Sequence, residues 1–225
     1  MKERNAVFYV KTCICIFMLI IYASDVQRFF ADSILTLFYL LLMFVIVIMM
    51  IPDIYREGKG FKDNPKTLLL IPLGILLIFI FDNLLMENFV EPYLFKAVGI
   101  TPEDANTERV FEMIRSNPVF MVLMTCFIAP IMEEILYRYT AFGLISKKNN
   151  IVAHIITAVL FGLQHVIEAG VYGGDVTQFI NIGSYIVYSL IMTNLYSKTK
   201  NLCIPIVIHI LINSFGVMFM LLTYQ

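Results

Sequence analysis

Two adjacent glutamates and an arginine interrupt an apolar stretch, IAPIMEEILYR, at residues 128–138. On a helix, Glu134 and Arg138 stand four residues apart, which is the favourable order for an ion pair, whereas Glu133 points about 100° away, in register with Tyr137. We therefore predict that Glu134 is paired and that Glu133 is a free carboxylate. A carboxylate in a poorly solvated cavity binds its proton more tightly, which suits a general base that takes a proton from water and passes it on.

Two further apolar segments carry acid–base groups. FGLQH ends at His165, with Phe161 one turn before it, and HILIN places His209 and Asn213 four residues apart. Ionisable groups inside a bilayer are costly and usually mark functional sites. His209 and Asn213 share a helix face and offer hydrogen-bond donors to a developing oxyanion. His165 would position the water, and Phe161 would shape the cavity.

Each of these residues, taken alone, has an ordinary structural explanation. The Glu–Arg pair would join two helices, the histidines would be hydrogen-bonded packing residues, and Asn213 would satisfy a neighbouring backbone group. Three separate segments that each present such groups favour a catalytic or transport site instead. His154 serves as a contrast, because it lies 11 residues before His165, roughly 16 Å along a helix, and is assigned to packing or an interface.

The same side chains raise the question of a metal. Glu133, His165 and His209 are all ligand types that zinc accepts. Water activation by a glutamate and oxyanion binding by a histidine and an asparagine need no ion, however. We therefore expect a site without a required cofactor, and a divalent metal such as zinc is the alternative.

The elements that must position these residues are membrane helices. Of the 225 residues, 60% are hydrophobic, far more than a soluble domain needs. A helix needs about 20 apolar residues to cross a bilayer, and seven windows of roughly that length stand between the charged clusters. The sequence thus predicts an all-α fold, a polytopic transmembrane helix bundle of about seven spans. The windows are 6–23, 33–52, 67–86, 118–145, 151–166, 176–196 and 202–224.

The distribution of positive charge predicts the topology. With the N-terminus inside, ten Lys and Arg fall on the inner side and four, Arg28, Lys96, Arg109 and Arg115, on the outer side. Basic residues are enriched in cytoplasmic loops, so we expect a cytoplasmic N-terminus and an active site that faces the cytoplasm. The formal net charge of −1 gives no reason to expect a nucleic-acid partner.

Composition divides the chain into three parts. Residues 1–86 hold three plain apolar spans, and residues 87–117 form a polar, acidic-leaning connection. The stretch TPEDANTERVFEMIRSN within it predicts a short surface helix capped by Thr101. Residues 118–225 hold the four helices with embedded polar groups, which we expect to be the catalytic core.

The three polar motifs together resemble those of a known family. EEILYR, FGLQH and HILIN match in order and approximate spacing the E-E-x-x-x-R, F-x-x-x-H and H-x-x-x-N motifs of the CAAX protease and bacteriocin-processing (CPBP, or Abi) family of intramembrane endopeptidases. The resemblance covers residues 118–219. It implies that Glu133 and His165 activate a water, that His209 and Asn213 stabilise the tetrahedral intermediate, and that Glu134 and Arg138 support the site.

The expected function is therefore hydrolysis of a peptide bond within the membrane. No H-E-x-x-H or G-x-S-x-G motif occurs in the sequence, which argues against two other classes of intramembrane protease. The resemblance suggests a membrane-associated peptide or lipidated protein as substrate, such as a CAAX-type protein, a peptide pheromone or a bacteriocin precursor. The short loops and compact size indicate a bacterial cytoplasmic membrane. The alternatives are a proton-coupled transporter or channel, and a non-catalytic membrane scaffold or immunity protein.

Overall fold

The computed structural model describes residues 6–23, 33–101 and 104–223, and every regular element in these ranges is a helix. The N-terminal part contains α1 (Ala6–Ala23), α2 (Ser33–Gly58) and the short α3 (Gly60–Asp63). A continuous helical stretch, Pro65–Ala97, follows and contains α4 (Leu70–Ile78), a π-helical segment (Phe79–Val90) and α5 (Glu91–Ala97). The predicted all-α membrane bundle is thereby confirmed.

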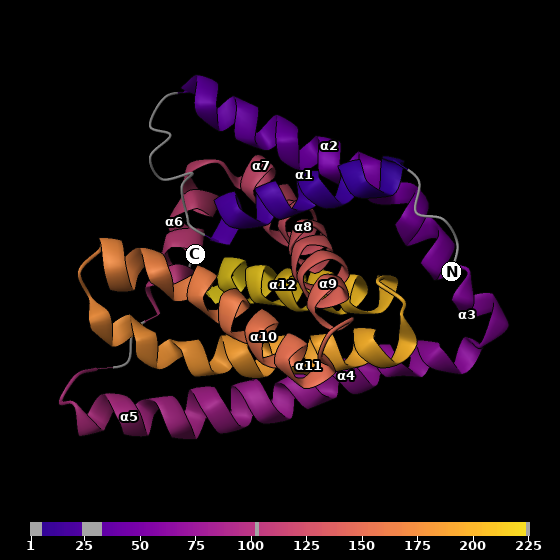
Figure 1. Cartoon of the computed structure of the whole chain (residues 1–225). Helices are drawn as coiled ribbons and strands as arrows, with labels where there is room; N and C mark the ends of the chain where they lie inside the picture. Colours follow the sequence, from indigo (N-terminus) through magenta and orange to yellow (C-terminus); the bar gives the residue numbers. More distant parts are fainter. Residues whose placement is uncertain (1–5, 24–32, 102–103, 224–225) are drawn as a thin grey trace.

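The C-terminal part supplies the helices that carry the polar motifs. After α6 (Ala105–Ser116), a long helical stretch, Pro118–Ile145, contains α7 (Pro118–Leu123), α8 (Ala129–Glu133) and α9 (Gly143–Ile145), with π-helical segments at Met124–Ile128 and Glu134–Phe142. It is followed by α10 (Asn150–Ile167), α11 (Ile182–Thr199) and α12 (Cys203–Thr223). In Figure 1 the stretch Pro118–Ile145 crosses α10, α11 and α12 obliquely, whereas α4, α5, α11 and α12 run along a common direction.

Proline explains where two of the π-helical segments lie. Pro92 and Pro130 have no N–H to donate to the carbonyl four residues earlier. Each proline lies just after the end of a π-helical segment, Phe79–Val90 and Met124–Ile128 respectively. Such widened turns occur frequently at functional sites, and here the first contains Asp82 and the second precedes Glu133.

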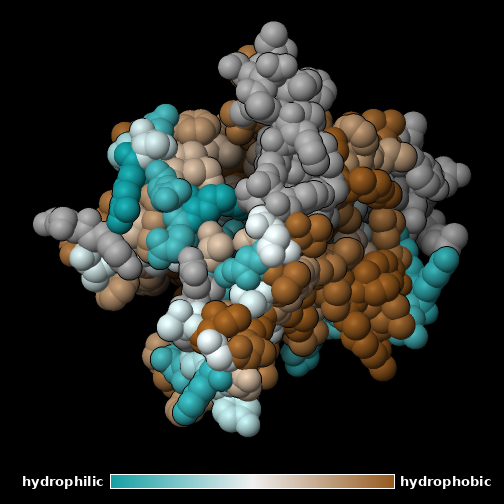
Figure 2. Space-filling view, turned by 90° about the vertical axis from the view of Figure 1, so that its left-hand side faces the viewer, coloured by the Kyte–Doolittle hydropathy of each residue, from teal (hydrophilic) through white to brown (hydrophobic). Residues whose placement is uncertain are grey.

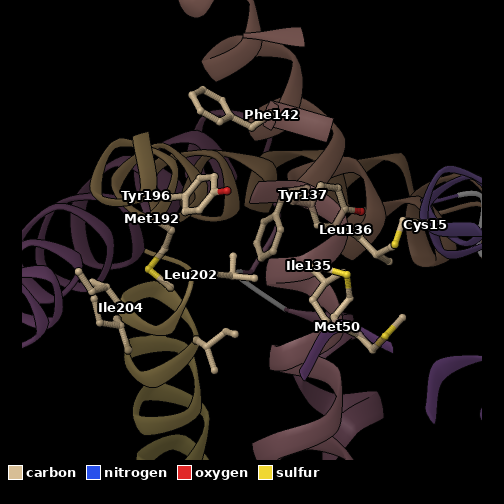
Figure 3. Close-up of a cluster of buried hydrophobic side chains, with 14 of the residues drawn as sticks. Cys15, Met50, Ile135, Leu136, Tyr137, Phe142, Met192, Tyr196, Leu202 and Ile204 are labelled. Atoms are coloured by element: carbon tan, nitrogen blue, oxygen red, sulfur yellow. The ribbon is translucent and has the colours of Figure 1, made fainter. Parts of the chain in front are cut away.

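The main hydrophobic core lies where α1, α2 and the stretch Pro118–Ile145, here called the crossing stretch, meet α11 and α12. Figure 3 shows Ile135, Leu136, Tyr137 and Phe142 of the crossing stretch facing side chains from the other helices. The remaining side chains labelled in this cluster are Cys15, Met50, Met192, Tyr196, Leu202 and Ile204. The crossing stretch is therefore packed on several sides, which fixes the rotation of the glutamates that it carries.

A close approach between two helices positions the FGLQH segment. A Cβ atom on Gly162 would lie 2.8 Å from Ile182 Cγ1, closer than packed carbon atoms come. Glycine at this position thus lets α10 and α11 lie side by side, and the two helices run together in Figure 1. Phe161 and His165, on either side of Gly162, are held against α11 as a result.

The connection between the two halves differs in detail from the prediction. The third apolar helix does not end near residue 86 but continues to Ala97. The predicted surface helix exists as α6, but its cap is Asp104, whose side chain accepts hydrogen bonds from the N–H groups of Asn106 and Thr107, and not Thr101. Ile114 of α6 is fully buried in a small cluster with Cys126, Val217 and Met220, so α6 packs on the bundle.

Five helices of the described residues are long and apolar enough to cross a membrane. They are Pro65–Ala97, Pro118–Ile145, Asn150–Ile167, Val176–Thr199 and Cys203–Thr223. The helices α1 and α2 occupy the first two predicted windows. The protein is a multi-pass membrane protein, and the count of seven spans stays a prediction.

Candidate active site

The structure brings the three polar motifs together at one cavity of about 1020 Å³. Glu133 reaches it from the crossing stretch, Phe161 and His165 from α10, and His209 and Asn213 from α12. Straight parallel helices would leave His165 and His209 at different depths, because His165 is near the end of α10 and His209 near the start of α12. Phe161 bridges them, with its ring centroid 4.6 Å from that of His165 and 6.3 Å from that of His209.

His209 lies between the two glutamates. Its Nδ1 donates a hydrogen bond of 2.8 Å to Glu134 Oε1, and its Nε2 lies 3.6 Å from Glu133 Oε2. The second distance is longer than a hydrogen bond, but the two groups form an ion pair when the ring is protonated. Neither contact could be inferred from spacing within one helix, because both glutamates lie in the stretch Pro118–Ile145 whereas His209 lies in α12.

The predicted pairing of Glu134 is confirmed and extended. Glu134 Oε2 lies 3.1 Å from Arg138 Nε, and both side chains are fully buried. Glu134 thus holds two cationic or potentially cationic groups, Arg138 and His209. The guanidinium of Arg138 also lies over the ring of Phe161, 4.9 Å from its centroid, which is a favourable cation–π distance.

The prediction that Glu133 is a free carboxylate is wrong. Besides His209, it has Gln164 as a neighbour, whose side-chain amide nitrogen lies 3.4 Å from Glu133 Oε1. Gln164 is itself held by a short hydrogen bond from the hydroxyl of Tyr137. The two glutamates nevertheless differ in position, because Glu133 lines the cavity whereas Glu134 does not.

Backbone contacts define the hydrogen-bonding state of His165. Its Nδ1 lies 2.8 Å from the carbonyl oxygen of Phe161. A carbonyl only accepts, so Nδ1 carries the hydrogen and, in the neutral ring, Nε2 is left as an acceptor. The ring is stacked on Tyr185, with centroids 4.2 Å apart, so both the tautomer and the orientation of His165 are fixed by its surroundings.

Asn213 keeps part of its hydrogen-bonding capacity for the cavity. Its amide donates one hydrogen bond of 2.9 Å to the carbonyl of Thr125, which leaves a second N–H and the amide oxygen. This contact ties α12 to the crossing stretch shortly before Pro130. Asn213 is thus oriented by backbone that belongs to the same stretch as Glu133.

Sequence reasoning missed three residues beside the site. Gln164 contacts Glu133, Tyr185 stacks on His165, and the ring of Tyr188 lies 5.2 Å from that of His209. Their side chains are uncharged, so a pattern of ionisable groups within apolar segments does not reveal them. His154, assigned from the sequence to packing or an interface, bonds the carbonyl of Asn150 and contacts the ring of Phe142, and it does not line the cavity.

A metal site does not emerge from the predicted candidates. Across residues 6–23, 33–101 and 104–223, no three His, Cys, Asp or Glu side chains are grouped so that they could hold a metal ion. Both ring nitrogens of His209 face carboxylates, and Nδ1 of His165 faces a carbonyl. The zinc alternative for Glu133, His165 and His209 therefore has no preformed set of ligands here.

The cavity lies in the part of the bundle near α5, α6 and the second half of α12, which all contribute to its lining. Its lining includes polar side chains from residues 82–109, and Figure 1 places α5 and α6 opposite the start of α1 and the Lys-containing α3. Figure 2 faces this end and shows hydrophilic residues gathered there beside a broad hydrophobic surface. With a cytoplasmic N-terminus this end of the bundle would lie on the outer side, which does not fit the prediction that the active site faces the cytoplasm.

An all-helical membrane bundle that gathers a glutamate, two histidines and an asparagine at one cavity, with a second glutamate buried behind one of the histidines, defines a candidate intramembrane hydrolase. Residues 115–215 match the family described as type II CAAX prenyl endopeptidase Rce1-like. This match and the bacterial relatives below support a protease of the CAAX protease and bacteriocin-processing family.

Two of the bacterial relatives are named as a membrane peptidase or protease. The chain is 27% identical over 180 residues to the putative membrane peptidase YdiL of Bacillus subtilis, a match that covers 79% of this chain and 67% of that protein. It is 31% identical over 157 residues to the membrane-embedded CAAX protease MroQ of Staphylococcus aureus, covering 67% and 57%. A third relative, the UPF0177 protein YvdC of Lactococcus lactis, is 22% identical over 175 residues, covering 78% and 64%. The matches thus span between 57% and 67% of these relatives, and no solved structure matches the chain significantly.

Proposed function

We propose that the protein hydrolyses a peptide bond of a membrane-associated peptide or lipidated protein, using a water activated by Glu133 and His165. The observation that carries this proposal is the placement of His209 between Glu133, which lines the cavity, and the fully buried Glu134. This arrangement gives the two glutamates different tasks. Glu133 can reach a substrate in the cavity, whereas Glu134 acts only through His209 and Arg138.

Water activation falls to Glu133 and His165. Nε2 of His165 is an acceptor in the neutral ring, so it can hold one hydrogen of the water while Glu133 takes the other. The resulting hydroxide attacks the carbonyl carbon, and Glu133 then passes its proton to the nitrogen of the departing amine. The proton that Glu133 took from water is thereby returned, and the carboxylate is regenerated.

Oxyanion stabilisation falls to His209 and Asn213. Glu134 Oε1 accepts the hydrogen bond from Nδ1 and so orients the ring of His209, and Nε2 is a donor toward the cavity when the ring carries a hydrogen on both nitrogens. The second N–H of Asn213 would supply another donor. Donors fixed in advance in a poorly solvated site stabilise the negative charge that develops on the carbonyl oxygen.

The dimensions of the cavity suit a peptide segment. A volume of about 1020 Å³ lies at the upper end of small-ligand pockets, and much of the lining is apolar. The relative from S. aureus is named a CAAX protease, which is compatible with a lipidated substrate for this chain. The same cavity would accept an unmodified membrane peptide.

Cleavage by the purified protein in lipid vesicles tests the proposal. A set of membrane peptides, with and without a prenylated C-terminal cysteine, would be incubated with the wild-type protein and with Glu133→Gln, and the products identified by mass spectrometry. The proposal expects new termini with the wild type only. Proton flux across the vesicle membrane in the absence of any cleavage would favour the transporter alternative.

A further inference from the structure

A second group of carboxylates lies in the same cavity, apart from the residues proposed to act on water. Asp82, Glu87 and Glu91 come from the helical stretch Pro65–Ala97, and all three line the cavity. In the π-helical segment Phe79–Val90, hydrogen bonds join residues five apart, so Asp82 and Glu87 lie one above the other. Glu91 follows one turn later on the same helix face. Asp82, Glu87 and Glu91 together are here called the acidic row.

Two of these carboxylates are buried without a counter-charge. Asp82 is 9% exposed and Glu91 is 8% exposed, and among the described residues neither forms an ion pair with a lysine or arginine. Glu91 Oε1 accepts a hydrogen bond of 3.2 Å from the backbone N–H of Ser184, whereas Asp82 Oδ1 has no hydrogen-bond partner in the described part of the chain. Uncompensated carboxylates inside a membrane helix are costly and point to function.

The charge balance of the cavity favours a cation. Five carboxylates line it, those of Asp82, Glu87, Glu91, Asp104 and Glu133, against the one guanidinium of Arg109 among the described lining residues. A cavity of one sign with low-dielectric walls concentrates ligands of the opposite sign. The absence of a three-ligand metal group within the described ranges favours an organic cation over a metal ion.

Tyr188 gives an independent sign of a ligand between this acidic row and the proposed hydrolytic site. Its side chain is 7% exposed and lines the cavity, and its hydroxyl has no hydrogen-bond partner among the described residues. Its ring lies 5.2 Å from His209. Ser184, whose N–H holds Glu91, is one turn away on α11, about 6 Å along the axis.

We propose that Asp82 and Glu91 form a subsite for the lysine or arginine side chain of a peptide substrate, with the Tyr188 hydroxyl bonding the peptide backbone beside it. This subsite rests on the function proposed above, because the position of the basic residue is counted from the peptide bond that is hydrolysed. On α11, one helical turn separates Ser184, which binds Glu91, from Tyr188, whose ring contacts His209. An extended peptide advances about 3.3 Å per residue. The basic residue therefore lies within about three residues of the scissile bond. Pro92 and Phe95, which also line the cavity, would pack on the aliphatic stem of that side chain.

Binding to a hydrolytically silent protein tests the subsite separately from activity. The Glu133→Gln variant in lipid nanodiscs would be titrated with fluorescent peptides that carry one lysine, norleucine or glutamate at each of six positions around a fixed centre. At one position the lysine peptide should bind about tenfold or more tighter than the norleucine peptide. Adding Asp82→Asn or Glu91→Gln should remove that preference. The amide introduced by Glu91→Gln keeps an oxygen for the N–H of Ser184, so this variant guards against loss of folding.

A matched control removes a carboxylate elsewhere on the same side of the molecule. Glu108 is exposed on α6 and does not line the cavity, so Glu108→Gln should leave the lysine preference unchanged. Equal binding of lysine and norleucine peptides, or no binding of any peptide, would overturn the subsite. Competition by millimolar Ca²⁺ or Mg²⁺ would also overturn it, in favour of a metal site.

The same peptides separate failure of the subsite from failure of the proposed function. A lysine preference in binding, with no cleavage of the bound peptides by the wild-type protein, would retain the subsite and count against hydrolysis. Cleavage by the wild type without a lysine preference would retain hydrolysis and overturn the subsite.

Discussion

Replacing Glu134 by glutamine should destabilise the protein and disturb His209 at the same time. One carboxylate oxygen forms an ion pair with Arg138, whose Nε lies 3.1 Å away, and the other accepts a hydrogen bond of 2.8 Å from His209 Nδ1. A glutamine offers only one oxygen, so its amide N–H₂ would face a donor on one side. Arg138, which is fully buried, would also lose the negative charge that compensates it.

The size of the effect follows from this burial. Removing one partner of a buried ion pair costs about 3–5 kcal/mol, which for a chain of this length corresponds to a fall in melting temperature of roughly 6–20 °C. Turnover should also fall, because His209 loses the carboxylate that orients its ring. Since the histidine itself remains, the fall should be smaller than the roughly 10²–10³-fold loss that follows removal of an oxyanion donor.

A double variant separates the two effects. Combining Glu134→Gln with Arg138→Met removes both charges and should recover part of the melting temperature, but not the turnover, because His209 still lacks its carboxylate. Melting curves in detergent and cleavage of one peptide by the same preparations would measure both quantities. A wild-type melting temperature for Glu134→Gln, or full recovery of turnover in the double variant, would refute this reasoning.

Three further predictions concern topology, metal and the oxyanion site. In a cysteine-free background, Lys147→Cys should react with an impermeant reagent only from the cytoplasm and Glu112→Cys only from outside; the reverse pattern would invert the topology. Peptide cleavage should survive treatment with a chelator, because the side chains of the site suffice for water activation, and loss of activity restored by zinc would contradict this. Asn213→Ala should lower kcat about 10²-fold or more with little change in KM; a change in KM alone would instead assign Asn213 to substrate binding.

Contacts within one helix could be predicted from the sequence. The spacing of Glu134 and Arg138 predicted their ion pair, and the helix-start signals of the segment from Thr101 predicted α6. The meeting of the three motifs at one cavity was expected from the cost of placing their polar groups in a membrane. These features depend on helix periodicity and on solvation, which a single sequence carries.

Contacts between helices could not be predicted in the same way. The position of His209 between Glu133 and Glu134 depends on the oblique crossing of the stretch Pro118–Ile145 over α12, which no local pattern encodes. Gln164 and Tyr188 are neutral and occur in helices where such residues are ordinary. The role of Asp82 depends on the π-helical winding of Phe79–Val90, which changes the face that it shares with its neighbours.

Hydrolysis by Glu133→Gln, compared with the wild type on one peptide in the same lipid vesicles, tests the central claim most directly. Glutamine keeps the size of Glu133 and an oxygen for Gln164 but removes the proton acceptor, and general-base catalysis contributes about 10²–10⁴-fold. We expect cleavage to fall by at least that range while the melting curve stays near that of the wild type. A stable Glu133→Gln protein that still cleaves the peptide at more than about a tenth of the wild-type rate would contradict the assignment of Glu133 as the base.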